Sequence, residues 1–303
     1  MTKGHGRERV KQVSHDIRLV HQGNALIGEC PTWNVEEQAL YWVDTRDPYI
    51  HRRDARGAIR SWKMPTGMGA FAFRRKGGLV AGMQNGFAFI DLDRETVEPF
   101  HDPEPTRPLN RLNDGKCDSM GRFWCGSRDA DGSNPTGSLY RLDPDLSCHR
   151  METGIIISNA MAFSPTEPAM IYGDSTGETV WRYDFDAARG TIANRTVFHD
   201  TRHLPWRVDG ANFDTEGYYW GALVYDWSIG RFAPDGRLDR LIRLPTRFPT
   251  MCCFGGPDLD VLYVTTASYF LDDKGRQDQP WAGAVLSIHG LGVRGLPPER
   301  FAG

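Results

Sequence analysis

The stretch Leu40-Tyr41-Trp42-Val43-Asp44 is an apolar and aromatic run that ends in an acidic residue, as expected of a buried β-strand that leads into a turn. Similar runs recur along the chain at residues 78–82, 122–126, 170–174, 218–222 and 261–265. Each is followed by a second strand-like segment, at 50–52, 87–90, 138–141, 180–183, 228–231 and 284–287. Most of these pairs end in Asp, Pro or Gly, which are typical of turns between antiparallel strands.

This sixfold repeat predicts an all-β, six-bladed β-propeller, because short antiparallel strands at blade-like spacing need neighbouring copies to bury their faces. The segment from Asp16 to His21 alternates as a strand does and precedes the first repeat. We expect it to pair with the last blade and close the ring. The chain shows no linker and no shift in composition. The predicted organisation is a polar N-terminal extension at 1–14 and a single propeller domain at 15–303.

Composition excludes several classes of partner. The 303 residues carry a net charge of -3, and Lys and Arg are scattered along the chain, so neither nucleic acid nor an anionic membrane is an expected partner. No apolar run is long enough to span a bilayer, and the first residues lack the apolar core of a signal peptide. The six cysteines have no CxxC spacing and two are adjacent, which favours a reduced interior and predicts a cytoplasmic protein.

A propeller usually places its site at one mouth of the central channel, where loops from several blades meet. Glu29, Asn113, Asn159 and Asp209 each stand beside a glycine or a chain bend at a similar phase of the repeat. Glu29, Asn159 and Asp209 could bind one divalent cation, and oxygen ligands favour calcium, magnesium or manganese. Taken singly, Asp-Gly and Asn-Asp-Gly are usually plain turns. These four residues indicate a site because they occupy equivalent positions in successive repeats.

Several segments resemble the signature segments of the regucalcin and gluconolactonase (senescence marker protein-like) family. They include Gly28-Glu29-Cys30-Pro31-Thr32-Trp33 and Arg111-Leu112-Asn113-Asp114-Gly115, and they occur in the family's order at 28–33, 111–118, 158–164, 208–214 and 252–256. The resemblance implies a six-bladed propeller that hydrolyses aldonolactones, of the gluconolactone, xylonolactone or arabinolactone type, with one divalent metal ion (calcium, magnesium, manganese or zinc).

The resemblance also implies a role for individual residues. The family's metal ligands fall on Glu29, Asn159 and Asp209, and its substrate-contacting arginine and asparagine fall on Arg111 and Asn113. Asp131 lies near a position where the family often has another acidic substrate contact. Three residues depart from the family pattern, namely Cys30, Ala160 and Val208. These departures affect the expected shape of the pocket, and hence the substrate, more than the metal site.

The expected chemistry needs no nucleophilic side chain. A lactone is an activated ester, and a divalent ion can polarise its carbonyl and stabilise the oxyanion that forms. Asp209 is the candidate general base, while Arg111 and Asn113 would hold sugar hydroxyls or the ring oxygen. A surface charge on a loop is the alternative interpretation of Arg111.

Two other classes of function stay open on the sequence. One is a related propeller hydrolase acting on phosphotriesters or other esters, and the other is a non-catalytic calcium-binding scaffold. A scaffold has no need of Glu29, Asn159 and Asp209 converging at one mouth, which favours an enzyme with a small-molecule sugar lactone as its partner.

Overall fold

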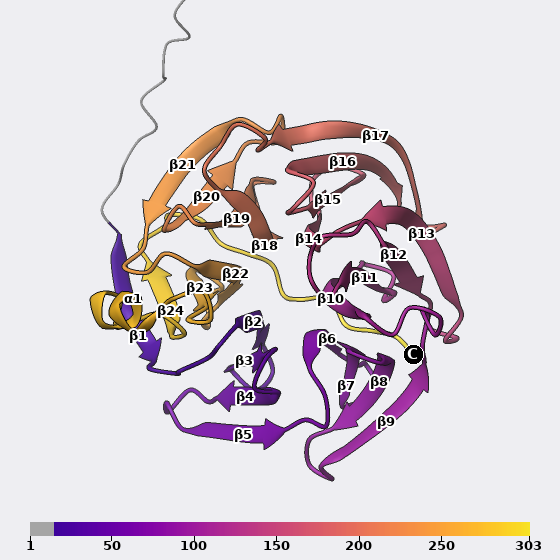
Figure 1. The fold of residues 1–303 in the computed structure, drawn as a ribbon, viewed down its shortest axis with the longest axis horizontal. Coiled ribbons are helices and arrows are strands. Elements are labelled where there is room, and N and C mark those ends of the chain that lie inside the picture. The colour runs from indigo at the N-terminus through magenta and orange to yellow at the C-terminus, as the bar shows by residue number, and fades with distance from the viewer. Residues whose placement is uncertain (1–14) are drawn as a thin grey trace, which may run out of the picture.

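The computed structural model describes residues 15–303, whose strands form six four-stranded antiparallel sheets around a central channel (Figure 1). Blades 1 to 3 contain β2 (Gly28–Asn34), β3 (Ala39–Asp44), β4 (Tyr49–Arg53), β5 (Ile59–Lys63); β6 (Met68–Phe73), β7 (Leu79–Met83), β8 (Gly86–Asp91), β9 (Thr96–His101); and β10 (Asn110–Cys117), β11 (Phe123–Asp129), β12 (Gly137–Leu142), β13 (Cys148–Ile155). Blades 4 to 6 contain β14 (Ser158–Phe163), β15 (Ala169–Asp174), β16 (Thr179–Asp186), β17 (Thr191–Asp200); β18 (Arg207–Phe213), β19 (Tyr219–Val224), β20 (Ser228–Phe232), β21 (Leu238–Arg243); and β22 (Pro249–Gly255), β23 (Val261–Thr266), β24 (Val285–His289), β1 (Asp16–His21). The prediction of an all-β, six-bladed propeller is confirmed.

The apolar runs found in the sequence are the second strand of each blade, and the segments that follow them are the third strands. Second strands such as β3 and β19 are buried along their whole length, because the flanking blades cover both of their faces. Trp42, Trp124 and Trp220 occupy such strands and are each at most 1% exposed. They fill the space between blades, as expected of large aromatic side chains in a sheet core.

Both ends of the described chain make contacts that hold the ring together. β1 pairs antiparallel with β24, with Asp16 opposite His289, so the last blade contains both early and late residues (Figure 1). The expected ring closure is confirmed, and it covers an edge that would otherwise be free to pair. After β24 the chain crosses the propeller to blade 2, where the buried Phe301 donates its backbone N–H to the Phe73 carbonyl oxygen.

The extension predicted at 1–14 lies outside the described residues, and the assignment of 15–303 to one domain stays a prediction. The one helix in the described part, α1 (Asp273–Asp278), lies in the connection between β23 and β24. No helix within residues 15–303 has the length and apolar character that a membrane crossing would need.

The first strand of each blade lines the channel, and neighbouring first strands contact one another around the ring. Each of these inner strands has a break in its pairing register, as between Glu29 and Thr32 in β2 or between Asn159 and Ala162 in β14. At both breaks the residue after the predicted ligand is left-handed, with φ of 48° at Cys30 and 64° at Ala160. Such bulges bend a strand and re-aim a side chain, and here they lie directly beside the predicted site.

Candidate functional site

The predicted ligands lie at one end of the channel. Glu29 and Asn159 are the second residues of β2 and β14, and Asp209 is the third residue of β18. All inner strands run in the same direction, so these residues share the end at which the inner strands begin, which we call the upper mouth. Arg111 and Asn113 occupy the beginning of β10 and belong to the same mouth. Arg111 is therefore on a strand rather than on a surface loop.

Asp131, the remaining predicted contact, lies in the connection between β11 and β12. Because β11 ends at the upper mouth, this loop lies at the correct end of the channel, but the Asp131 side chain is solvent-exposed. The structure thus brings five of the predicted residues together in the channel and leaves Asp131 at its rim.

Three carboxyl groups near the upper mouth influence one another electrostatically. Burial raises the pKa of Glu29 well above its usual value, and the nearby Asp209 and Asp114 raise it further. Burial and Asp114 likewise raise the pKa of Asp209 to about 8, against the opposing effect of Arg128. Asp114 itself is buried, and its Oδ2 accepts a hydrogen bond from the Met161 backbone at 3.0 Å. The sequence motif contains Asp114 but did not predict its place beside the ligands.

This arrangement fits a divalent cation. A cation between Glu29 and Asp209 would remove the repulsion that raises their pKa values, and Asn159 would supply a neutral oxygen. Within residues 15–303 no group of three or more His, Cys, Asp or Glu side chains is placed to hold a metal. The predicted donor set would be two carboxylates and one amide, which suits a hard cation better than a structural zinc ion.

Hydrogen bonds orient the Asn159 amide. Its Oδ1 accepts from Nδ2 of Asn113 at 3.0 Å, and its Nδ2 donates to Oγ of Ser175 at 2.9 Å. Ser175 in turn donates to the carbonyl oxygen of Val208, the residue before Asp209, at 2.8 Å. This chain of contacts links blades 3, 4 and 5, and it fixes which atom of Asn159 is the oxygen. Ser175 was not among the predicted residues.

Buried aspartates hold the segments that lead into the ligand strands. Asp174 accepts hydrogen bonds from the backbone N–H groups of Ile156 and Ile157, just before β14, and from those of Thr176 and Gly177 in its own turn. Asp44 does the same in blade 1, where two of its four donors lie just before β2. The acidic residue that ends each of these apolar runs thus positions the strand that carries Asn159 or Glu29.

Two sequence patterns near the upper mouth have structural roles. Gly173-Asp174-Ser175-Thr176-Gly177 matches the Gly-x-Ser-x-Gly pattern of serine hydrolases, but it forms a strand-to-strand turn and not the strand-to-helix turn that exposes a nucleophile. His199 and His203 have the spacing of a helical metal-ligand pair, but His199 lies near the end of β17 and stacks on Trp206. Neither pattern indicates a competing catalytic centre.

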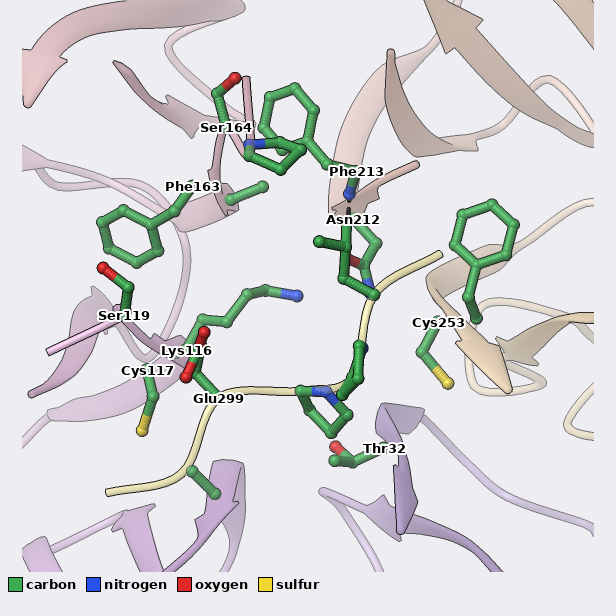
Figure 2. A pocket seen from close by; sticks show the side chains of 18 of the residues that line it. Thr32, Lys116, Cys117, Ser119, Phe163, Ser164, Asn212, Phe213, Cys253 and Glu299 are labelled. Carbon is green, nitrogen blue, oxygen red and sulfur yellow. Dashed lines mark hydrogen bonds between the residues drawn. The ribbon is translucent and has the colours of Figure 1, made fainter. Parts of the chain in front are cut away.

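A separate cavity of about 480 Å³ lies at the opposite end of the channel, where the inner strands finish (Figure 2). Lys116, Asn212 and Cys253 from the ends of β10, β18 and β22 line it, together with Glu299 from the C-terminal crossing segment. Lys116 extends into this space and donates to the Ala211 carbonyl oxygen at 2.8 Å. None of the predicted ligands lines this cavity, so it and the candidate site are distinct.

Comparison with known proteins agrees with the propeller fold and shows the family. The family model described as the SMP-30/gluconolactonase/LRE-like region matches residues 27–268. A 6-deoxy-6-sulfogluconolactonase of Pseudomonas putida is 32% identical over 296 residues, covering 96% of this chain and 100% of that protein. Regucalcin of Gallus gallus is 34% identical over 294 residues, covering 95% and 98%. The solved structure of a luciferin-regenerating enzyme matches with a TM-score of 0.89 at 30% identity, covering 95% of this chain and 100% of that one.

Proposed function

Because this chain belongs to the SMP-30, gluconolactonase and regucalcin family, a family of lactonase-type hydrolases, we propose that it is a metal-dependent enzyme that opens a sugar lactone to the sugar acid. The observation that carries the proposal is the pair of carboxyl groups, Glu29 and Asp209, whose charges act on one another in the channel, at the same mouth as the oriented amide of Asn159. An aldonolactone of the gluconolactone, xylonolactone or arabinolactone type is the proposed substrate class.

In this proposal Glu29, Asn159 and Asp209 hold one divalent cation, which polarises the lactone carbonyl when bound. Asp209 accepts a proton from the attacking water as the water oxygen bonds to the carbonyl carbon. The bond between that carbon and the ring oxygen then breaks, and the ring oxygen takes up a proton to become a hydroxyl group. The products are a sugar acid and no other fragment, because the leaving group stays attached.

Arg111 and Asn113 are proposed to hold the sugar. The Asn113 amide nitrogen already donates to the Ser158 carbonyl oxygen at 2.8 Å and to Asn159 at 3.0 Å, which leaves its Oδ1 to accept from a sugar hydroxyl. Asp131 is retained as a proposed contact from the rim. The cytoplasmic location also remains a proposal, and the six free cysteines agree with a reducing compartment.

A substrate panel with controlled metal content tests this function. The protein is freed of metal with a chelator, titrated with calcium, magnesium, manganese or zinc, and assayed on glucono-, xylono-, arabino- and galactonolactone and on one phosphotriester. We expect at least one lactone to be hydrolysed with metal and not after chelation, while circular dichroism shows the fold intact. Full activity after exhaustive chelation would refute the metal dependence. Turnover of the phosphotriester alone points to the related hydrolase, and metal binding without turnover points to the scaffold.

A further inference from the structure

Two arginines face each other across a hairpin at the upper mouth. Arg111 of β10 is directly opposite Arg128 of β11 in the pairing register, so the two side chains leave the sheet on the same face. Like charges in directly opposite positions destabilise a sheet. Burial, with the added effect of Arg128 and Arg46, lowers the pKa of Arg111 to about 10. The fold gains no stability from placing these cations together.

Other buried arginines of this protein have carboxylate partners. Arg231 contacts Asp214, Glu216 and Asp239 at distances of 2.6 to 3.0 Å, and Arg122 contacts Asp118 at 2.9 Å. These ion pairs offset the cost of removing a guanidinium from water.

Arg111 and Arg128 lack such partners. Within residues 15–303, no carboxylate oxygen lies within 4.0 Å of either guanidinium group. The hydrogen bond that Arg128 makes is to the backbone oxygen of Asp129, at 3.1 Å. The Asp129 carboxylate is turned to the backbone N–H groups of Ser133 and Asn134 at 2.9 and 3.1 Å. Two partly buried cations are therefore left without a hydrogen-bonded anion.

The charges that favour these cations include the proposed metal ligands, together with Asp129 in the case of Arg128. Glu29 acts on both guanidinium groups, and Asp209 acts on Arg128. A divalent cation would neutralise these two carboxylates. The remaining anion would be Asp129, which acts on Arg128 and whose carboxylate is turned to Ser133 and Asn134, so the two guanidinium groups would share less than one full negative charge. Arg46 adds a third cation at the rim, where its guanidinium lies 4.8 Å from the centre of the exposed Tyr269 ring.

We infer that the substrate of this site is an anionic lactone, whose phosphate, sulfonate or second carboxylate group is bound by Arg111 and Arg128 while its lactone carbonyl faces Glu29 and Asp209. This inference rests on the proposed function. A planar guanidinium donates paired hydrogen bonds to such oxyanions, and two of them on one face of a sheet form a receptor for one group. Arg111 would then bind the charged substituent and not only sugar hydroxyls.

The test compares matched lactones. Metal-loaded protein is assayed on gluconolactone, 6-phosphogluconolactone, 6-deoxy-6-sulfogluconolactone and a glucarolactone. We expect a higher kcat/KM for at least one anionic lactone than for gluconolactone. The KM of that lactone should rise with ionic strength, because salt screens the attraction. Arg128→Met should lower the preference for the anionic over the neutral lactone about 10- to 100-fold, the usual worth of a charge-assisted hydrogen bond. Arg128→Lys should restore part of it.

Arg94→Met is the control, because Arg94 lies on the outside of blade 2 with a side chain that is 82% exposed. Equal losses on neutral and anionic lactones in Arg128→Met, or no anionic preference in the wild type, would overturn the inference. If no lactone is hydrolysed, the proposed function fails while the anion site remains testable. Calorimetry with glucitol 6-phosphate and glucitol then tests the anion site. Binding of glucitol 6-phosphate but not of glucitol, with loss of that binding in Arg128→Met, supports the site. Equal binding of the two compounds, or no binding of either, overturns it.

Discussion

Replacing Asp174 by alanine should loosen the strand that carries Asn159. Asp174 is 4% exposed and its carboxylate accepts four backbone hydrogen bonds, at 2.8 to 3.1 Å. The donors Thr176 and Gly177 are exposed, so water can replace the lost acceptor for them, whereas those of Ile156 and Ile157 are half-buried.

We assign about 0.5 kcal/mol to each exposed donor and about 1 kcal/mol or slightly more to each half-buried one, which gives a loss of about 3 kcal/mol in the free energy of unfolding. For a chain of 303 residues, with an unfolding entropy of about 2.1 cal/mol/K per residue, this corresponds to a fall in Tm of about 5 °C. The same turn contains Ser175, which orients Asn159, so metal affinity should fall about 10- to 100-fold as well.

Urea unfolding and isothermal titration of metal measure the two effects separately. Asp258→Ala is the matched control, because the Asp258 side chain is 66% exposed and its nearest cation, on Arg294, is 3.8 Å away. It should change stability by less than about 0.5 kcal/mol. Should Asp174→Ala not fold, Asp174→Asn keeps one oxygen acceptor and should show a smaller loss. If Asp174→Ala has the same free energy of unfolding as the wild type and binds metal equally well, the hydrogen bonds of this turn do not position the strand that carries Asn159.

Asp209→Asn keeps an oxygen for the cation but cannot accept a proton, so kcat at saturating metal should fall roughly 10²- to 10⁴-fold; recovery of the wild-type kcat at high metal would leave Asp209 as a ligand only. In the metal-free protein the pKa of Asp209 is raised to about 8, above the unfolded value of about 4, so the folded state binds the extra proton and stability should fall as pH rises between these values. Urea unfolding at stepped pH should show a shallower fall in Asp209→Asn, and parallel profiles would contradict the buried-acid argument. Phe301→Ala should cost about 3–5 kcal/mol in unfolding free energy, since its fully buried ring fastens the C-terminal segment to blade 2; a thermal melt unchanged from wild type would show that this crossing does not stabilise the propeller.

The sequence by itself determined the two middle strands of each blade, the blade number and the closure of the ring. A strand that is buried between two neighbouring blades needs a short apolar run, such as Leu40 to Asp44. Such a run is visible in a few consecutive residues, and it recurs once in each blade. The family segments added the candidate residues Glu29, Asn159 and Asp209, and the inner strands place them at one mouth. Their roles as metal ligands remain predictions that metal titration and the Asp209→Asn variant test.

Only the tertiary structure decided what surrounds these residues. With an unbroken register in the β10–β11 hairpin, Arg111 would lie opposite Asp129 and form an ordinary cross-strand ion pair. The bulge between Leu112 and Gly115 shifts the pairing by one residue and places Arg128 there instead. A one-residue shift exchanges the faces of a strand, and no local pattern in the sequence marks it. Ser175 and Asp114 were missed for a related reason, since each acts through contacts with strands of neighbouring blades that only the closed ring brings within hydrogen-bond distance.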